Sequence, residues 1–425
     1  MKKYILKNGI PIILEQMPGT QTITALVLFK VGSRNESQAV NGVSHFIEHL
    51  FFKGTQKRPS SFAIAKELDG VGAEFNAFTG KDFTGYYIKV ARKHLVLATD
   101  ILEDLLFHPI FDQKEIDKER GVIIEEINLY EDIPMRSSEE IAEQLMFGAQ
   151  HPLGYFIIGS KENIRHFSRE QIITYRDRYY HPGNMVIIFA GNLPSKTMKI
   201  VHEKFHQTPQ NENKIPQLKK FVDKQSFARI KIKYKKTAQA HLALAFPAVG
   251  YNSAQLVVAK VLATILGGGM SSRLFINVRD KQGLCYYIGA ENSPYQETGA
   301  FVVRAGFDVT RLNQALRAII KELQDIKQQP VLAEELAKAK EYIIGKTAIY
   351  MEDSEFIANW WGSEMLFQKK YCSPKKYATL VRAVTVKQVQ NLANKILQAR
   401  KANLAIIGPY SKKQENKFKR YLHEL

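Results

Sequence analysis

The sequence predicts an α+β protein made of two similar domains, and three observations lead to this fold class. Strand-like segments are mixed with long helical patterns, without the strict alternation of a parallel βαβ fold. Similar strands recur in the two halves of the chain at a nearly constant offset. A polar stretch at 208–226 lacks apolar periodicity and predicts a linker. We therefore expect domains at 1–207 and 227–425, each an antiparallel-rich sheet packed by helices.

Length and composition support two soluble domains. The chain has 425 residues, more than one hydrophobic core usually supports, and it is 45% hydrophobic and 24% charged. No apolar run approaches the eighteen or so residues that a membrane helix needs, and the first residues do not resemble a secretory signal. Only two cysteines occur, Cys285 and Cys372, which is typical of reduced thiols. We expect no membrane span and a cytoplasmic location.

The excess of basic over acidic residues is confined to the second half. Residues 1–200 carry 24 basic and 24 acidic groups, whereas 201–425 carry 36 and 18, which accounts for the whole net charge of +18. A solvated basic surface explains this excess, and attraction to an acidic partner or between unlike halves of two subunits is the alternative. No zinc-finger, RRM or homeodomain pattern is present, so nucleic acid is not the expected partner.

In the first half, the elements follow from hydrophobic periodicity. The strands are expected at 23–32, 73–79, 83–91 and 184–190, with a hairpin turn between the second and the third. Amphipathic patterns predict helices at 42–53, 61–70, 93–106, 114–131, 137–148, 168–179 and 195–206.

The second half repeats this plan. Strands are expected at 228–236, 241–250, 284–291, 298–306 and 403–407. Helices are expected at 253–266, 272–282, 309–327, 331–350, 353–368 and 387–398. Gly32 and Gly250, at the ends of matching strands, are 218 positions apart, and the strands near 184 and 403 are offset by 219. This repetition suggests an internal duplication.

The segment most informative about chemistry is His45-Phe46-Ile47-Glu48-His49. Residues four apart lie one turn above each other on a helix, so His45 and His49 can both reach one metal ion. Glu48 shares that face and can hold a water molecule beside the metal. The H-x-x-E-H order is a zinc-protease signature. The alternative interpretation is a pair of surface histidines on an amphipathic helix.

A catalytic zinc site needs a third protein ligand and an open position. The acid-rich helix expected at 114–131 is the obvious source. Glu119 and Glu126 are seven residues apart and project from the same face, whereas Glu125 points about 100° away from Glu126. Acidic residues on a helix are also typical of a solvated face, so this spacing by itself leaves the third ligand open.

The sequence resembles the M16 metallopeptidases, the pitrilysin or inverzincin family. The family pattern is H-x-x-E-H followed, some seventy residues later, by E-R-x-V-x-x-x-E, and here 76 residues separate His49 from Glu126 in Glu119-Arg-Gly-Val-Ile-Ile-Glu-Glu126. The resemblance implies Zn2+ held by His45, His49 and Glu126, with Glu48 as the general base. It also implies that Glu119 orients a ligand histidine.

Two further segments are similar to family elements. Asn76, Ala77, Phe78 and Thr79 match the N-A-x-T edge strand, on which the resemblance implies that an extended substrate adds as another strand. Arg279 and Tyr286 match the R-x(6)-Y element, which implies contacts to the substrate carbonyl. From the residues alone, Arg279 would cap a helix and Tyr286 would begin a strand.

The resemblance covers nearly the whole chain and implies a short, two-domain member similar to the β-subunit of the mitochondrial processing peptidase. It implies the LuxS/MPP-like metallohydrolase fold and a clam-shell dimer, either a homodimer or a heterodimer with a paralogous subunit. The expected activity is endopeptidase cleavage of unfolded peptides or precursor segments inside an enclosed chamber. Some relatives have lost their ligands, so the alternative is a non-catalytic peptide-binding or assembly subunit.

Overall fold

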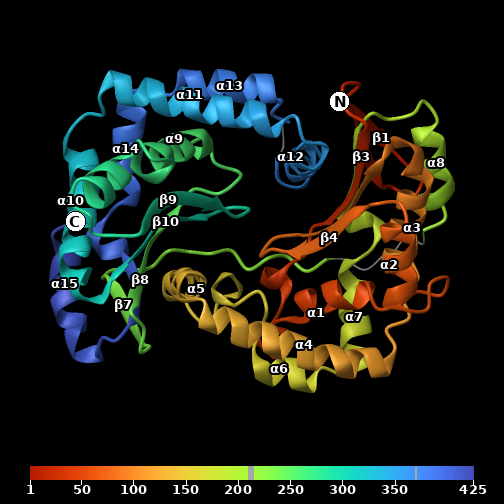
Figure 1. Ribbon diagram of the computed structural model, residues 1–425, viewed down its shortest axis with the longest axis horizontal. Helices are drawn as coiled ribbons and strands as arrows, with labels where there is room; N and C mark the ends of the chain where they lie inside the picture. Colours follow the sequence, from red (N-terminus) through yellow and green to blue (C-terminus); the bar gives the residue numbers. More distant parts are fainter. Residues whose placement is uncertain (209–214, 369–370) are drawn as a thin grey trace. The chain divides into compact units, whose positions relative to one another are not determined.

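The computed structural model describes residues 1–208, 215–368 and 371–425 and has the predicted α+β class (Figure 1). The chain forms two compact units. Unit 1 comprises 1–127, 155–218 and 348–371, and unit 2 comprises 128–154, 219–347 and 372–425. Part of the predicted linker, 209–214, lies outside the described residues. Each unit therefore contains segments from both halves of the sequence.

Unit 1 is built on a six-stranded sheet with the order β1-β2-β6-β3-β5-β4. Strands β2 and β6 are parallel, and the other neighbours are antiparallel. The strands are β1 (Lys2–Ile5), β2 (Pro11–Gln16), β3 (Thr22–Phe29), β4 (Glu74–Thr79), β5 (Thr84–Ala91) and β6 (Met185–Gly191). The predicted hairpin is confirmed as β4–β5, which places β4 at the edge of the sheet.

Helices cover both faces of this sheet. Helix α3 packs against β3 and β5, and α1 lies against β4. The helices of unit 1 are α1 (Val43–Phe51), α2 (Ser61–Asp69), α3 (Leu95–Phe107), α4 (Gln113–Asp132), which continues into unit 2, α6 (Lys161–His166), α7 (Arg169–Tyr179), α8 (Thr197–Phe205) and α12 (Ser354–Phe367).

Unit 2 is built on a five-stranded sheet with the order β7-β11-β8-β10-β9, in which only β7 and β11, among the described strands, are parallel. Its strands are β7 (Arg229–Tyr234), β8 (Gln239–Ala248), β9 (Tyr287–Pro294), β10 (Gly299–Asp308) and β11 (Asn403–Gly408). Its helices are α5 (Pro134–Phe147), α9 (Leu256–Gly267), α10 (Leu312–Gln328), α11 (Ala333–Tyr350), which continues into unit 1, α13 (Pro374–Ala383), α14 (Val386–Ile396) and α15 (Glu415–His423).

Two helices pack on the sheet of the opposite sequence half (Figure 1). Helix α12, from the second half, lies on β3 and β6 in unit 1, where Trp361 joins an apolar cluster with Leu28 and Ile188. A Cβ atom on Gly362 would lie 2.4 Å from Leu28, so glycine permits this close approach. Helix α5, from the first half, lies on β8 and β11 in unit 2. Each sheet thus buries one apolar face under a helix that is distant in sequence.

Some elements differ in detail from the sequence expectations. The predicted strand at 284–291 begins later, at Tyr287, after a glycine with positive φ at Gly283. The predicted helix at 272–282 is π-helical over Phe275–Asp280. The elements β1, β2, α6, α13 and α15 were not predicted from the sequence. Within the described part of the chain, no helix has both the length and the apolar character of a membrane span.

Candidate metal centre

The helix that carries the H-x-x-E-H segment begins at an unusual cap. Gly42 is the N-cap residue of α1, and its φ of 102° lies in the left-handed region that favours glycine. Because glycine has no side chain, it cannot cap the free N–H groups of the helix itself. The buried carboxylate of Glu36 takes this role, because it accepts hydrogen bonds from the backbone N–H groups of Gly42 and Ser44, both at 2.8 Å. Asn41 donates a third, also at 2.8 Å. The start of α1 is therefore fixed by a side chain outside the helix.

Burial raises the pKa of Glu36 to about 7, although these hydrogen bonds oppose the shift. The carboxylate is paired with backbone donors instead of a cation. The backbone hydrogen bonds that offset the burial of this carboxylate also hold the first turn of α1 in place.

The structure brings His45, His49 and Glu126 together. The two imidazole rings are one turn apart on α1, with centroids 4.8 Å apart. Glu126 reaches them from α4: its Oε2 lies 3.6 Å from Nε2 of His45 and 3.4 Å from Nε2 of His49. The three residues offer ligand atoms that all lie within 4.8 Å of one another. The neighbouring Glu125 is exposed, so the helix presents Glu126 to the rings.

These separations fit a tetrahedral zinc ion. Ligand atoms at 2.0–2.1 Å from such an ion lie about 3.3 Å from one another. The two nitrogen-to-oxygen distances, 3.6 and 3.4 Å, are close to this value before any adjustment to a bound ion. Two imidazoles and one carboxylate are also a donor set that zinc prefers, and three protein ligands leave a fourth position open.

A second carboxylate holds one of the rings. Glu119 is 1% exposed, and its Oε2 lies 3.0 Å from Nδ1 of His49. Nζ of Lys53 lies 2.7 Å from the other carboxylate oxygen. The Nδ1–H group of His49 donates to Glu119, so the neutral ring would keep its proton on Nδ1 and turn the lone pair of Nε2 toward Glu126.

The charges around His49 shift its titration. Burial would lower the pKa of His49, but its hydrogen bonds to Glu119 and Glu126 outweigh burial and raise it to about 9. Burial would raise the pKa of Glu119, and hydrogen bonds from His49 and Lys53 bring it below its ordinary value instead. In the metal-free protein at neutral pH, His49 is therefore a cation between two carboxylates.

Glu48 lies on the same helix face, beside the paired rings. The hydroxyl of Thr79 donates to its Oε2 over 2.5 Å. Burial raises the pKa of Glu48, opposed by the Thr79 hydrogen bond and by His49, and the charge of Glu126 adds to the increase. A carboxylate with a raised pKa next to a metal position is suited to accept a proton from water.

The predicted substrate strand is the edge strand β4. Asn76, Ala77, Phe78 and Thr79 pair with Tyr87, Tyr86, Gly85 and Thr84 of β5. Among the described strands, β4 has no neighbour on its other side. Its outer edge can pair with an extended chain through backbone hydrogen bonds.

Arg279 and Tyr286 belong to unit 2, whereas His45, Glu48, His49 and Glu126 belong to unit 1. The Arg279 guanidinium stacks on Phe275, 4.6 Å from the ring centroid, within the π-helical turn. Tyr286 is 54% exposed and directly precedes β9, where its N–H donates to Gly306. Their predicted contact with substrate stays a prediction.

Two contributors to the site were not predicted from the sequence. Glu36 lies six residues before Gly42, and no capping pattern connects them. Lys53 was more accessible to prediction, because it lies four residues after His49 within the helix expected at 42–53, although α1 itself ends at Phe51. Neither residue belongs to a recognisable motif. Glu36 holds the backbone at the start of α1, and Lys53 pairs with Glu119.

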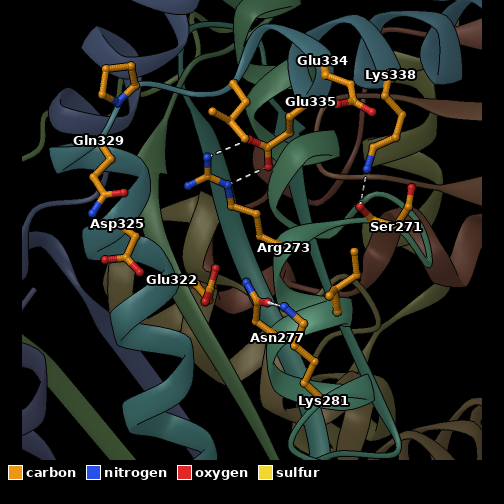
Figure 2. Close-up of a pocket in the computed structure, with 13 residues that line it drawn as sticks. Ser271, Arg273, Asn277, Lys281, Glu322, Asp325, Gln329, Glu334, Glu335 and Lys338 are labelled. Atoms are coloured by element: carbon orange, nitrogen blue, oxygen red, sulfur yellow. Dashed lines mark hydrogen bonds and ion pairs between the residues drawn. The ribbon is translucent and has the colours of Figure 1, made fainter.

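Unit 2 also contains a pocket of about 500 Å³ (Figure 2). Arg273 and Glu335, two of the residues that line it, form a bidentate ion pair with both N–O distances at 2.7 Å. Nζ of Lys338 donates to the carbonyl oxygen of Ser271. Acidic and basic side chains are interleaved around the wall, so no single sign of charge converges on a ligand position.

Comparison with known proteins identifies the family. Residues 11–154 match the family model described as insulinase (peptidase family M16), and residues 166–343 match the peptidase M16 inactive domain. A Bacillus subtilis protein described as an uncharacterized zinc protease is 34% identical over 410 residues, which cover 96% of this chain and 98% of that protein. A Streptomyces coelicolor protein with the same description is 31% identical, covering 98% and 91%.

A solved structure shows the same fold. The crystal structure of a protease from Helicobacter pylori superposes with a TM-score of 0.91 at 23% identity and covers 96% of this chain and 98% of that one. The family models and the relatives thus place the chain in a class of proteins whose described members are zinc proteases. The chain belongs to the M16 peptidase family, as the sequence resemblance predicted.

Proposed function

We propose that this protein is a zinc-dependent endopeptidase that hydrolyses unfolded peptides or precursor segments. The observation that carries the proposal is the convergence of His45, His49 and Glu126 beside the half-buried carboxylate of Glu48. This arrangement has the donor set of a catalytic zinc site together with a group able to move a proton.

His45, His49 and Glu126 would hold the zinc ion, and Glu119 would keep His49 in the correct tautomer. Bound zinc supplies Lewis acidity, which lowers the pKa of water and polarises a carbonyl oxygen. Glu48 takes the proton of the attacking water and later delivers it to the leaving amine. The raised pKa of Glu48 suits both transfers, because the group must accept and then release a proton near neutral pH.

The substrate would bind as an additional strand on β4, along Asn76, Ala77, Phe78 and Thr79. Pairing through backbone groups gives affinity with little demand on sequence. Arg279 and Tyr286, from this chain or from a partner subunit, would stabilise the developing oxyanion.

We further propose a cytoplasmic dimer, either of identical subunits or with a paralogous M16 subunit. The dimer would enclose a chamber that admits unfolded chains and excludes folded proteins. The chamber would then select substrates by whether they are unfolded, because backbone pairing with β4 depends little on the substrate sequence.

The test is cleavage of a mixed library of unstructured peptides, with products mapped by mass spectrometry, after metal analysis of the purified protein. We expect about one zinc per chain and cleavage that a chelator abolishes and added zinc restores. Glu48→Gln should retain zinc and lose about 10²- to 10⁴-fold in turnover, the usual contribution of a general base. The matched control is Glu125→Gln, an exposed acid of the same unit.

Two outcomes would contradict the proposal. Retained turnover in zinc-loaded Glu48→Gln would remove Glu48 as the base. Bound zinc without cleavage of any peptide by the wild-type protein would favour the alternative, a non-catalytic subunit that binds peptides and keeps the fold.

A further inference from the structure

The contact between Thr79 and Glu48 joins the two parts of the proposed active site. Thr79 is the last residue of β4, and Glu48 lies on α1, 31 positions earlier. We propose that Thr79 is a positioning residue, whose hydroxyl orients the Glu48 carboxylate and couples the substrate-binding strand to the general base. This inference rests on the proposed peptidase function and assigns Thr79 a role beyond backbone pairing.

The direction of the hydrogen bond decides which oxygen of Glu48 does the chemistry. The Thr79 hydroxyl donates to Oε2, so this oxygen is already occupied by a proton donor. Oε1 is the oxygen left to receive a proton from water. When Oε1 becomes protonated, Oε2 can still accept from Thr79, so the contact persists through the proton transfer. The carboxylate would therefore keep one orientation during both steps.

The sheet fixes the position of Thr79. Thr79 pairs with Thr84 of β5, and its neighbour Phe78 packs edge-to-face on Phe83, with centroids 5.8 Å apart, on the opposite side of the strand. The side chains of alternate residues share a face. Phe75, on the same face as Thr79, stacks near Phe52 at the end of α1. Hence β4 presents Thr79 to α1 from a rigid support, and a β-branched side chain has few rotamers.

This arrangement links substrate binding to the base. A peptide that pairs with the free edge of β4 adds backbone hydrogen bonds to the strand that holds Thr79. The same strand then restrains Glu48. Because effective proton transfer needs close geometry, a loss of this restraint should lower the rate of the chemical step more than it weakens substrate binding.

The test compares Thr79→Val, which keeps the shape and removes the hydroxyl, with Thr79→Ser, which keeps the hydroxyl. Thr24→Val is the matched control: Thr24 is buried in the same sheet and hydrogen-bonds Ser354 at 2.8 Å, away from Glu48. We expect Thr79→Val to lose roughly 10- to 100-fold in kcat with KM changed less than about threefold, at unchanged zinc content. Thr79→Ser should restore kcat to within about threefold, and Thr24→Val should keep it.

Crystal structures of the zinc-loaded variants give a second readout that does not depend on turnover. We expect the Glu48 carboxylate to be turned or split between orientations in Thr79→Val, and single in the wild type and Thr79→Ser. Wild-type kcat in Thr79→Val, or one unchanged Glu48 orientation, would overturn the proposal. An inactive wild type with a Glu48 orientation that depends on Thr79 would contradict the peptidase function and leave the positioning contact established.

Discussion

The two units share a sheet plan and differ in chemistry. In unit 1 the parallel pair β2–β6 is followed by β3, β5 and β4, and in unit 2 the parallel pair β7–β11 is followed by β8, β10 and β9. Each sheet also has one face covered by a helix from the opposite half, α12 or α5. Only unit 1, among the described residues, contains a group of histidines and acids that could hold a metal ion. The scaffold therefore exists without the site, which depends on a few side chains.

Helices α4 and α11 show where the difference arises. The buried residues of α4 include Ile116, Glu119 and Ile123, and those of α11 are Leu336, Ala339 and Ile343, with the same spacing. In this register, Ala339 stands where unit 1 has Glu119, and Lys346 stands where it has Glu126. Counting 218 residues from α1, the separation of Gly32 and Gly250, places Ala263, Leu266 and Gly267 at the positions of His45, Glu48 and His49.

The largest expected effect on zinc binding comes from replacing Glu126 by lysine, the residue at the matching position of unit 2. Glu126→Lys removes a ligand and places an ammonium beside two imidazoles, so zinc binding and peptide cleavage should both be lost. The fall in affinity should exceed the 10- to 100-fold typical of residues outside the ligand shell. Competition with a chromophoric chelator measures it, with Glu125→Lys as the control of equal charge change. Near-normal zinc affinity in Glu126→Lys would exclude Glu126 as a ligand.

A smaller effect is expected from Glu119→Ala, the residue found in α11. Loss of the hydrogen bond to His49 should weaken zinc binding about 10- to 100-fold, because the ring loses its tautomer and orientation. Since Glu119 is buried against Lys53, the variant also leaves that ammonium without its carboxylate. Glu119→Ala with Lys53→Met separates the two effects. If the double variant binds zinc as tightly as the wild type, Glu119 does not orient the ligand.

The smallest effect is a pH dependence of zinc binding. With a pKa of about 9, His49 is protonated at neutral pH, held by Glu119 and Glu126 next to His45. Zinc needs the neutral ring, so apparent affinity should rise about tenfold per pH unit up to about pH 9 and then level off. Calorimetry in buffers of different ionisation enthalpy should detect about one proton released from this ring at pH 7. An affinity that is constant between pH 7 and 9 would contradict the shifted pKa.

The same raised pKa makes the stability of the metal-free protein fall as pH rises, whereas zinc affinity increases. A histidine whose pKa is raised on folding stabilises the folded state fully below its unfolded pKa of about 6.5, and this contribution is lost as pH rises through about 9. Zinc binding and metal-free stability should therefore change in opposite directions over this interval, which unfolding measurements with and without chelator would show.

Sequence periodicity predicted the local parts of the site, whereas its long-range parts, Glu126 and Glu119, were implied only by the family resemblance. Helical periodicity places His45 and His49 one turn apart, and the structure brings both to Glu126. Strand alternation and turn residues predicted the hairpin that makes β4 an edge. The Glu36 cap depends on a loop conformation around Gly42 that no periodic pattern encodes.

The exchange of α5 and α12 between the halves was not predicted for the same reason. A helix that packs on a nearby sheet and one that packs on a distant sheet have the same amphipathic pattern, and only tertiary contacts distinguish them.

The placement of α12 has a consequence for biosynthesis. Leu28 and Ile188 belong to strands made early, yet the helix that covers them ends at Phe367. While the ribosome is still translating the second half, one apolar face of the unit 1 sheet stays exposed. A nascent chain in that state is prone to aggregate. Cellular production of this protein should therefore rely on holding chaperones until synthesis is nearly finished, and cutting the gene between its two repeats should not yield two independently folding fragments.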